Sequence, residues 1–361
     1  MVVNNVEFFM STSLQNFGSL VAIIAGSMVL SGCGGDNTKN KTETASSATV
    51  TKEDPIVIRL GHQSNPGEPF YEGCEKWKQL VEEKSKGAVK VELYPSNQLG
   101  SKEDLLDQMV AGEPICTLAD GAYFYDRGIK DLGITFGPYL FNSMDEAYKL
   151  YNSEWFNGQA KLLSEKAQMQ ILASNWRFGV RHTLTTKPLN SIEDFKGLKI
   201  RVPTNVIQLK GQEVLGAKPT PMPLGEVYTA LQQGTIDGVE NPVALLYYGK
   251  FHEVAKYLLL DAHVYNMTTI VVGTKFYNSL SPDIQKLLVE TCKEAGAYQN
   301  ELSEKADAEI LQKLKDEGVT VIEPSPEYKQ NLVDTSKDFY SLPEFKDWSP
   351  NLYDTVKKAM Q

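Results

Sequence analysis

Cysteine and histidine are both scarce in this sequence, with four residues of each among 361. Four cysteines are too few for a disulfide-dense scaffold, and the four histidines lack the close spacing of a metal site. Basic residues are also in the minority, because 36 lysines and arginines face 46 aspartates and glutamates and leave a net charge of −10. Nucleic acids are bound through a basic face, so this balance argues against a nucleic-acid partner.

Catalytic motifs are missing as well. The chain has no glycine-lysine pattern of a nucleotide-binding loop, no dinucleotide fingerprint and no serine on a glycine-flanked elbow. Its acidic residues fall mainly on expected helix faces and caps, which does not support a pair of catalytic carboxylates. The sequence therefore gives no sign of an enzyme, a metal site or a cofactor.

The N-terminal segment has the pattern of an export signal. Residues 18–30 form an uncharged apolar run, too short to span a bilayer comfortably, and the small residues before Cys33 follow at once. This arrangement resembles the bacterial lipoprotein box, so we expect 1–32 to be a signal peptide and Cys33 to be lipidated. No Lys or Arg precedes Lys39, which is unusual for an export signal, and a short uncleaved anchor is the alternative.

A polar stretch follows the expected lipidation site. Residues 34–54 are small and polar and show no periodicity, so we assign 33–55 to a lipid anchor and flexible tether. The other three cysteines, at 74, 116 and 292, have no ligand spacing and are expected to be small buried side chains.

From residue 55 onward, strand and helix patterns alternate. Strands are expected at 56–60, 89–93, 115–118, 169–173, 198–202 and 268–272. Helices are expected over 70–81, after the capping pairs Ser101/Asp104 and Ser191/Asp194, over 224–233, and from Pro282 to about Glu317. The alternation is typical of an α/β fold with a largely parallel sheet. The length favours two domains, which the last, long helix could brace.

Two arginines are candidates for holding an anion, and Arg201 lies at the end of the expected strand at 198–202. Arg201 comes directly before Val202 and Pro203, and Arg181 lies within 175–182. Ligand clefts form at strand ends, and a guanidinium there can hold a carboxylate through two parallel hydrogen bonds. Taken alone, an arginine at a strand end is more often part of a surface ion pair.

The segments around these arginines resemble one protein family. The resemblance is to the DctP family, the extracytoplasmic solute-binding proteins of TRAP (tripartite ATP-independent periplasmic) transporters, and covers about 56–330. It is carried, in one order, by the segments 94–100, 196–203, 216–222, 225–234, 237–242 and 250–254. It implies an α/β, two-domain, periplasmic-binding-protein-like (Venus flytrap) fold with a long domain-spanning helix and a ligand in the cleft between the domains.

The resemblance also implies ligand-binding residues. Arg201 corresponds to the arginine that binds the ligand carboxylate, Arg181 to a second arginine that assists it, and Asn241 to an asparagine that contacts the ligand. A turn residue before Pro242 is the alternative for Asn241. Asp120 corresponds to an acidic residue that meets ligand hydroxyls in sialic-acid-type members, with a helix cap as its alternative.

Four further side chains are candidates near the cleft. His62 ends the first expected strand, where the sialic-acid subgroup has an asparagine. Tyr228 and Trp176 could line the pocket, although large aromatics at periodic positions are more often core. His263 aligns with a histidine near the family's cleft and hinge, and a packed structural role is its alternative.

The resemblance implies domain I at 56–178 with 267–306 and domain II at 179–266 with 307–361. We expect a monomeric receptor in the cell envelope, lipid-anchored outside the cytoplasmic membrane, that delivers a small-molecule carboxylate to TRAP permease subunits. A sugar acid such as a uronate is the favoured ligand, because the polar candidates near the arginines suit hydroxyl groups. A C4-dicarboxylate or keto acid is the alternative ligand, and a sensory receptor is the alternative role.

Overall fold

The computed structural model describes residues 54–361. The expected signal peptide, Cys33 and nearly all of the expected tether lie outside the described residues. Within 54–361, no helix combines the length and the apolar character that a membrane crossing requires.

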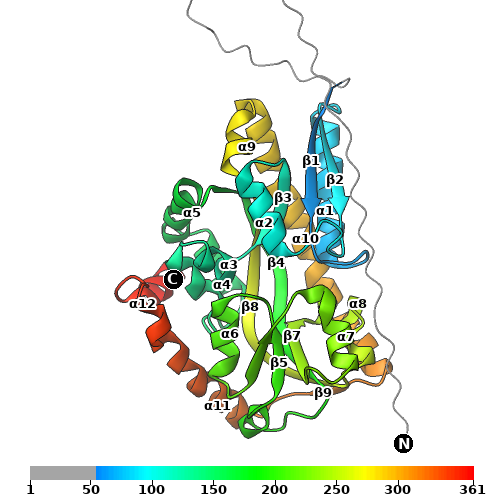
Figure 1. Ribbon diagram of the computed structural model, residues 1–361, viewed down its shortest axis with the longest axis vertical. Helices are drawn as coiled ribbons and strands as arrows, with labels where there is room; N and C mark the ends of the chain where they lie inside the picture. Colours follow the sequence, from blue (N-terminus) through cyan, green and yellow to red (C-terminus); the bar gives the residue numbers. More distant parts are fainter. Residues whose placement is uncertain (1–53) are drawn as a thin grey trace, which may run out of the picture. The chain divides into compact units, whose positions relative to one another are not determined.

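One mixed sheet organises residues 54–361 (Figure 1). Eight of its nine strands run in the order β2-β1-β3-β8-β4-β7-β5-β6, and β9 pairs with β8 outside this path. The strands are β1 (Ile56–Gly61), β2 (Val89–Tyr94), β3 (Ile115–Ala119), β4 (Met169–Thr185), β5 (Lys199–Val202), β6 (Lys218–Pro221), β7 (Gly238–Pro242), β8 (Tyr257–Gly273) and β9 (Thr320–Ile322).

The expected parallel pairing is found toward both ends of the sheet but not in its centre. β1 pairs in parallel with β2 and β3, and β5 with β6 and β7. The pairs β3–β8, β4–β8 and β4–β7 are antiparallel, so the prediction of a largely parallel sheet is wrong for the centre. The strand patterns at 169–173 and 268–272 are only parts of β4 and β8, which are 17 residues long and link both ends of the sheet. Local periodicity does not reveal this long-range pairing.

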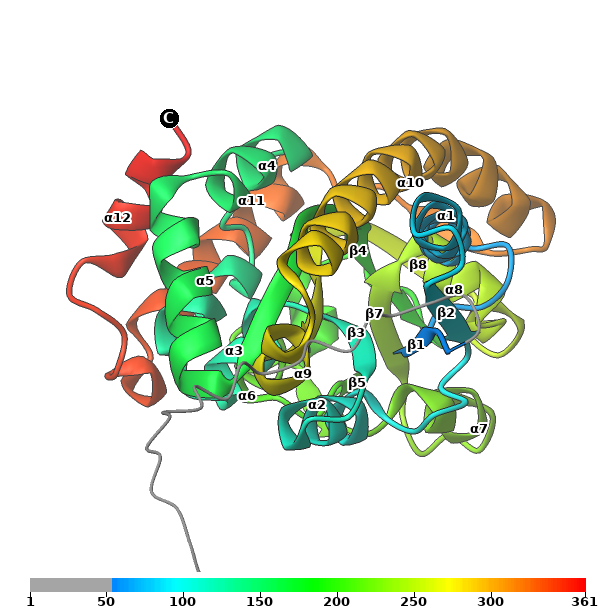
Figure 2. The same ribbon diagram turned by 90° about the horizontal axis from the view of Figure 1, so that it is seen from above.

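The helices pack around this sheet. They are α1 (Pro69–Lys84), α2 (Lys102–Ala111), α3 (Gly121–Asp126), α4 (Met144–Tyr151), α5 (Glu154–Ala167), α6 (Val206–Glu213), α7 (Val227–Gln232), α8 (Val243–Tyr248), α9 (Thr274–Ser279), α10 (Pro282–Asp316), α11 (Pro326–Ser336) and α12 (Leu352–Ala359). Figure 2 shows α10 passing beside α1.

Most of the expected helix boundaries are confirmed. α10 begins at Pro282 and has 35 residues, and the Ser101/Asp104 capping box starts α2. The Ser191/Asp194 box starts a single 3-10 turn, Ile192–Phe195. The helix expected over 224–233 is divided into a 3-10 turn, Leu224–Glu226, and α7.

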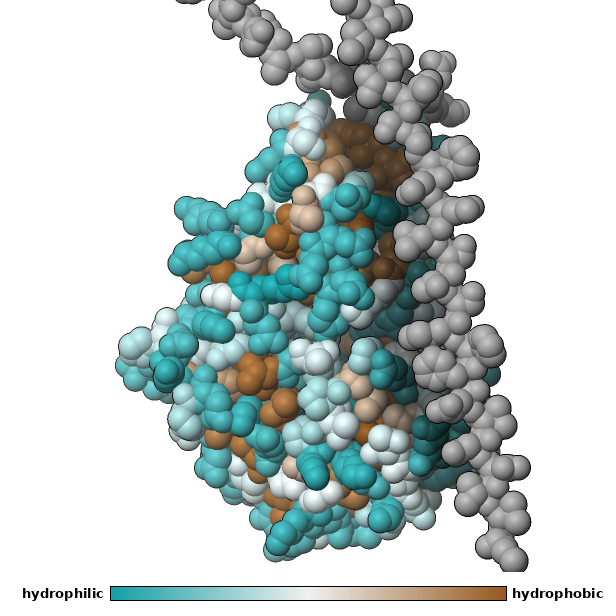
Figure 3. All heavy atoms as spheres, viewed as in Figure 1, coloured by the Kyte–Doolittle hydropathy of each residue, from teal (hydrophilic) through white to brown (hydrophobic). Residues whose placement is uncertain are grey.

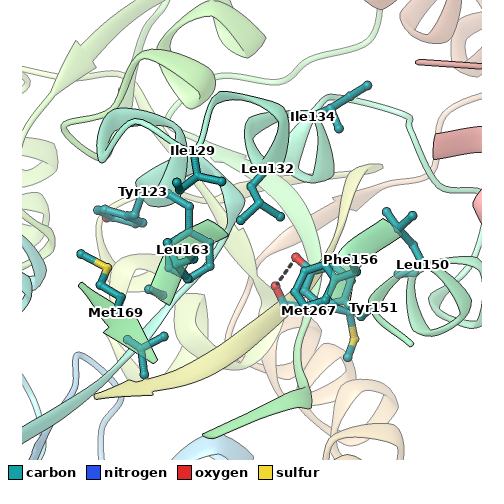
Figure 4. Close-up of a cluster of buried hydrophobic side chains, with 14 of the residues drawn as sticks. Tyr123, Ile129, Leu132, Ile134, Leu150, Tyr151, Phe156, Leu163, Met169 and Met267 are labelled. Atoms are coloured by element: carbon teal, nitrogen blue, oxygen red, sulfur yellow. Dashed lines mark hydrogen bonds between the residues drawn. The ribbon is translucent and has the colours of Figure 1, made fainter. Parts of the chain in front are cut away.

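The interior holds the large apolar side chains. In Figure 4, Tyr151 stacks on Phe156 with 4.4 Å between ring centroids and donates a hydrogen bond to the Met267 carbonyl at 3.4 Å. α12 joins this cluster through Leu352 and Val356 and contacts α4 and α5. Hydrophilic residues dominate the face drawn in Figure 3, which agrees with the gathering of apolar side chains inside.

Trp176 ties the long helix to the sheet. This β4 residue is fully buried, and its indole N–H donates to the Cys292 carbonyl on α10 at 3.1 Å. Gly73 of α1 lies against it, and a Cβ at this glycine would stand 2.8 Å from the Trp176 ring and 2.7 Å from the Gln299 Cβ. Trp176 is therefore a core residue, as its periodic position favours, and α1 can approach α10 closely only because position 73 is glycine.

The contrast between two helical glycines tests this packing. Gly73→Ala should destabilise the protein by about 1–3 kcal/mol, because the added methyl overpacks the contact with Trp176 and Gln299. Gly158→Ala is the matched control in α5, where a Cβ meets nothing within 4 Å, and it should stabilise by about 0.5–1 kcal/mol. Urea unfolding measures both, and equal effects would contradict the tight α1–α10 contact.

A chain of buried ionic side chains joins β4, β7 and β8. Arg181 on β4 donates to the Glu240 carboxylate on β7 through Nε at 2.5 Å and Nη2 at 2.7 Å. His263 on β8 places Nε2 3.0 Å from Glu240, and its Nδ1 lies 3.0 Å from an Asp261 carboxylate oxygen. All four side chains are buried. Opposite charges therefore alternate across the three strands.

The neighbours in this ionic chain decide its pKa values. Burial opposes the charge on His263, but Asp261 and Glu240 outweigh burial and raise the pKa of His263 to about 9. Burial also opposes the charge on Glu240, yet Arg181 and His263 lower the pKa of Glu240 to about 2. The same balance lowers the pKa of Asp261. His263 thus has the packed structural role that was its alternative.

The contribution of His263 to the stability of the fold should decline as pH rises from 7 to 9. A histidine whose pKa is raised on folding stabilises the protein fully below its unfolded value near 6.5, and this contribution is lost as pH rises through about 9. We expect the contribution of His263 to the free energy of unfolding to fall by about 1–3 kcal/mol over this interval. Lys102, whose pKa is lowered to about 8 on folding, acts in the opposite direction, so the contribution is measured in urea at pH 7 and 9 as the difference between wild type and a variant without the imidazole. The interval starts at pH 7 to avoid the titration of the buried Glu68, whose pKa is raised to about 7 on folding. The decrease in stability that Glu68 causes as pH rises takes place mainly below pH 7.

The His263→Gln variant should remove most of this pH dependence. Its difference from wild type cancels the contributions of other titrating groups. His252→Gln is the control, because His252 bonds to Glu317, a half-exposed carboxylate, and should keep the slope. A slope that persists in His263→Gln would refute the assignment.

Candidate functional site

A cavity of about 290 Å³ lies where the strands from both ends of the sheet meet. Four of the six predicted ligand-binding residues line it: Arg201 on β5, Arg181 on β4, Asn241 on β7 and Asp120 directly after β3. We call this space the arginine cavity. The structure therefore brings together side chains that are up to 121 positions apart in the chain.

Arg201 presents a buried charge to the arginine cavity. Its Nε and Nη2 both donate to the Met222 carbonyl, at 2.9 and 2.7 Å, and within residues 54–361 it forms no ion pair. Burial lowers the pKa of Arg201 to about 10, although Tyr123 and Glu240 favour the charged form. A buried cation without a carboxylate partner favours an anionic ligand.

Arg181 lines the same cavity but already has a counterion. Besides the two bonds to the Glu240 carboxylate, its Nη2 donates to the Glu240 carbonyl at 2.9 Å and its Nη1 to Asn266 Oδ1 at 3.2 Å. The guanidinium lies over the Phe136 ring, 5.3 Å from its centroid. These partners fix Arg181 in place and neutralise most of its charge.

Asn241 and Asp120 offer polar atoms to the cavity. Asn241 lies within β7, so its alternative reading as a turn residue is wrong. Its buried Nδ2 has no hydrogen-bond partner among the described residues, which leaves a donor for a ligand. Asp120 caps α3 by accepting from Ala122 N at 3.1 Å, so its helix-cap role is present alongside its place in the cavity wall. Burial raises the pKa of Asp120, partly offset by Lys102.

The structure does not place His62 or Tyr228 in the arginine cavity wall. His62 is buried against the edges of Phe70 and Tyr71, and burial lowers its pKa to about 4. Its neighbour Gln63 lines the cavity instead. Tyr228 lines an adjoining cavity, and its hydroxyl donates to Glu253 at 2.8 Å.

Several polar residues of the cavity wall were not predicted from the sequence, among them Lys102, Gln208 and Asn266. Lys102 follows the Ser101 cap and lies over the Tyr123 ring at 4.5 Å, and burial lowers its pKa to about 8. Its position directly after the Ser101 cap, at the start of a helix, is the one sequence signal that could have indicated Lys102 as a wall residue. Gln208 donates to Glu240 at 3.1 Å, and Asn266 accepts from Arg181, but both lie inside ordinary helix and strand patterns that carry no such signal.

No metal-binding cluster of three or more His, Cys, Asp or Glu side chains occurs in the described residues. The cysteines at 74, 116 and 292 are free and buried, as predicted.

Known proteins share this architecture. The family of bacterial extracellular solute-binding proteins, family 7 (DctP), matches residues 60–345. The sialic acid-binding periplasmic protein SiaP of Vibrio cholerae is 31% identical over 298 residues, which are 82% of this chain and 92% of SiaP.

Solved structures agree with this match. A TRAP periplasmic solute-binding protein from Ochrobacterium anthropi with bound L-fuconate is 38% identical, with a TM-score of 0.81 over 85% of this chain and 100% of its own. One from Actinobacillus succinogenes with bound L-galactonate is 37% identical, with a TM-score of 0.80 over 84% and 99%. Other matched structures hold different small molecules, succinate among them.

These matches confirm the predicted two-domain, periplasmic-binding-protein-like α/β fold with its long helix. They also agree with the expectation of a binding protein, since the matched proteins are named for the solutes that they bind. The chain belongs to the DctP family, whose members are periplasmic solute receptors of TRAP transporters and not enzymes.

Proposed function

We propose that this receptor captures a sugar acid, a hexuronate or aldonate, and delivers it to the TRAP permease subunits. The observation that carries the proposal is Arg201, a buried cation that lines the cavity without a carboxylate partner in the described chain. Its Nε–Nη2 edge is directed at the Met222 carbonyl, so the Nη1–Nη2 edge is left for the ligand's carboxylate.

The distribution of charge favours one carboxylate on the ligand. Arg181 is ion-paired with Glu240, and Asp120 and Glu103 favour the charge of Lys102. Within residues 54–361, Arg201 is the buried arginine of the cavity wall that has no ion pair. A C4-dicarboxylate would need a second such cation. L-fuconate and L-galactonate, the ligands of the two similar structures, are sugar acids with one carboxylate.

Neutral polar groups suit the hydroxyls of a sugar acid. The Asn241 Nδ2 is a free donor, and Asp120 has a second carboxylate oxygen beyond the one that caps α3. Gln208 and Asn266 contribute further amide groups to the wall. Hydroxyls both donate and accept hydrogen bonds, so a wall that offers both kinds of group matches a polyhydroxylated chain.

The predicted domains provide a mechanism of capture. We propose that domain I (56–178 with 267–306) and domain II (179–266 with 307–361) close around the ligand, with β4, β8 and α10 running through both. α12 lies at the end of the domain II segment but packs on α4 and α5, which are elements of domain I. The residues of α12 therefore connect the two proposed domains.

We further propose that the receptor is a monomer held at the membrane. Cys33 would carry the lipid after removal of 1–32, and 33–55 would tether the folded part. The support is the position of Cys33 directly after an apolar run and small residues. The tether would let one anchored receptor reach both free ligand and permease.

Arg201→Ala should lower affinity for the cognate sugar acid at least about 100-fold, because the ligand's buried carboxylate loses its partner. Arg201→Lys keeps the charge but not the paired donors and should lose less. Isothermal titration with galactonate and galacturonate measures both variants. Arg59→Ala is the control, since Arg59 pairs with the exposed Glu113 on the surface. An unchanged affinity in Arg201→Ala would contradict the proposed site.

Sugar acids should stabilise the wild-type protein more than dicarboxylates do. A ligand at about 100 times its Kd adds about 2.7 kcal/mol of stability, which is a shift of several degrees in Tm. Thermal unfolding with galactonate, galacturonate, succinate and a plain keto acid makes the comparison at equal concentrations. A larger shift with succinate would favour the C4-dicarboxylate alternative and refute the proposal.

A further inference from the structure

A second cavity of about 180 Å³ adjoins the arginine cavity. Gln63, Asn97, Leu224 and Gly225 line both spaces, so the two cavities are direct neighbours. The other lining residues of the second space are Asn65, Ser96, Tyr228, Leu245, Gly249 and Phe251. None of its ten lining residues is charged, and we call it the neutral cavity.

One wall of the neutral cavity is held in place by a buried carboxyl group. Glu68 accepts hydrogen bonds from the backbone N of Asn65 at 2.7 Å and from its Nδ2 at 3.1 Å. Ser96 donates to the Asn65 Oδ1 at 2.7 Å. Both ends of the Asn65 amide are therefore fixed before any ligand arrives.

The backbone of this wall adopts a conformation that ordinary residues avoid. Ser96 and Asn97 have φ values of 53° and 60°, two consecutive left-handed residues that are not glycine. Backbone hydrogen bonds from Ser96 N to the Ser64 carbonyl at 3.1 Å and from Asn97 N to the His62 carbonyl at 3.0 Å hold them there. Such strain gathers at ligand-binding loops, and here it places Asn97 at the boundary of the two cavities.

The opposite wall carries aromatic surface. Tyr228 is fixed by its hydrogen bond to Glu253, and Phe251 lies close by in the same wall. Gly225 and Gly249 also line the cavity, and a Cβ at Gly225 would meet nothing within 4 Å. Aromatic faces together with amide and hydroxyl groups provide the apolar surface and the few placed polar groups that a neutral ring of hydroxyls and C–H faces can use.

We propose that the neutral cavity is a second subsite and that the receptor takes a sugar acid carrying a second, uncharged sugar unit. The inference rests on the proposed function, which places the acid group at Arg201. All the charged lining residues lie in the arginine cavity. An acidic disaccharide has the same division, with its one carboxylate at one end and a neutral ring at the other. Tyr228 then contacts the neutral ring.

Matched acids test the second subsite by isothermal titration. Gluconate is compared with lactobionate, which is gluconate bearing a neutral galactose, and galacturonate with galacturonosyl-rhamnose. In each pair whose acid binds, the glycosylated form should bind at least about tenfold more tightly. An equal or weaker affinity of the glycosylated form would overturn the second subsite but leave the sugar-acid proposal standing. If neither acid nor glycosylated acid binds, both proposals fail.

A tyrosine pair separates the subsite from general effects on folding. Tyr228→Ala should weaken the glycosylated acid about fivefold to tenfold more than the acid alone, because only the longer ligand reaches its ring. Tyr298→Ala removes an exposed tyrosine of α10 and should change neither affinity. Equal losses for the two ligands in Tyr228→Ala would overturn the assignment of Tyr228 to the neutral ring.

Discussion

The ion pair between Arg181 and Glu240 is the contact on which the arrangement of the site depends. The pair is buried, and the free-energy cost of burying its charges is offset only because each charged side chain of the cluster has a partner of opposite charge. The ionic contacts continue from Glu240 to His263 and from His263 to Asp261. They thereby connect β4, β7 and β8, the strands that link the two ends of the sheet. Because Glu240 neutralises Arg181, the proposed recognition of an anion falls to the guanidinium of Arg201.

The sequence could predict the elements whose signals are local. The capping box before α2 and the proline at the start of α10 mark their own boundaries. The helix expected over 224–233 was placed correctly but is interrupted after Glu226, which periodicity alone does not reveal. The antiparallel centre could not be predicted, because β4 and β8 pair between residues that are far apart in the chain, such as Met169 with Gly273 and Thr185 with Tyr257.

The candidate site divides in the same way. Arg201, Asn241 and Asp120 stand at or near the ends of short strands. The place at a strand end pointed to Arg201, whereas Asn241 and Asp120 were predicted from the resemblance to the DctP family. Glu240 is the direct neighbour of Asn241, yet only the folded chain reveals that it pairs with Arg181 rather than facing the ligand. Tyr228 was expected in the pocket and instead lines the cavity beside it, a distinction that depends on the path of the 224–233 segment.

The contact between Arg201 and Met222 has a consequence for repeated binding and release of the ligand. The guanidinium is oriented by a peptide dipole and not by a protein anion. In the function that we propose, a carboxylate that arrives at Arg201 therefore has no protein anion to displace. Ligand binding then adds a partner to Arg201 without replacing one, and after release of the ligand the guanidinium is still oriented by the Met222 carbonyl. A receptor that must pass its cargo on and return empty can repeat that cycle without rebuilding its own recognition group.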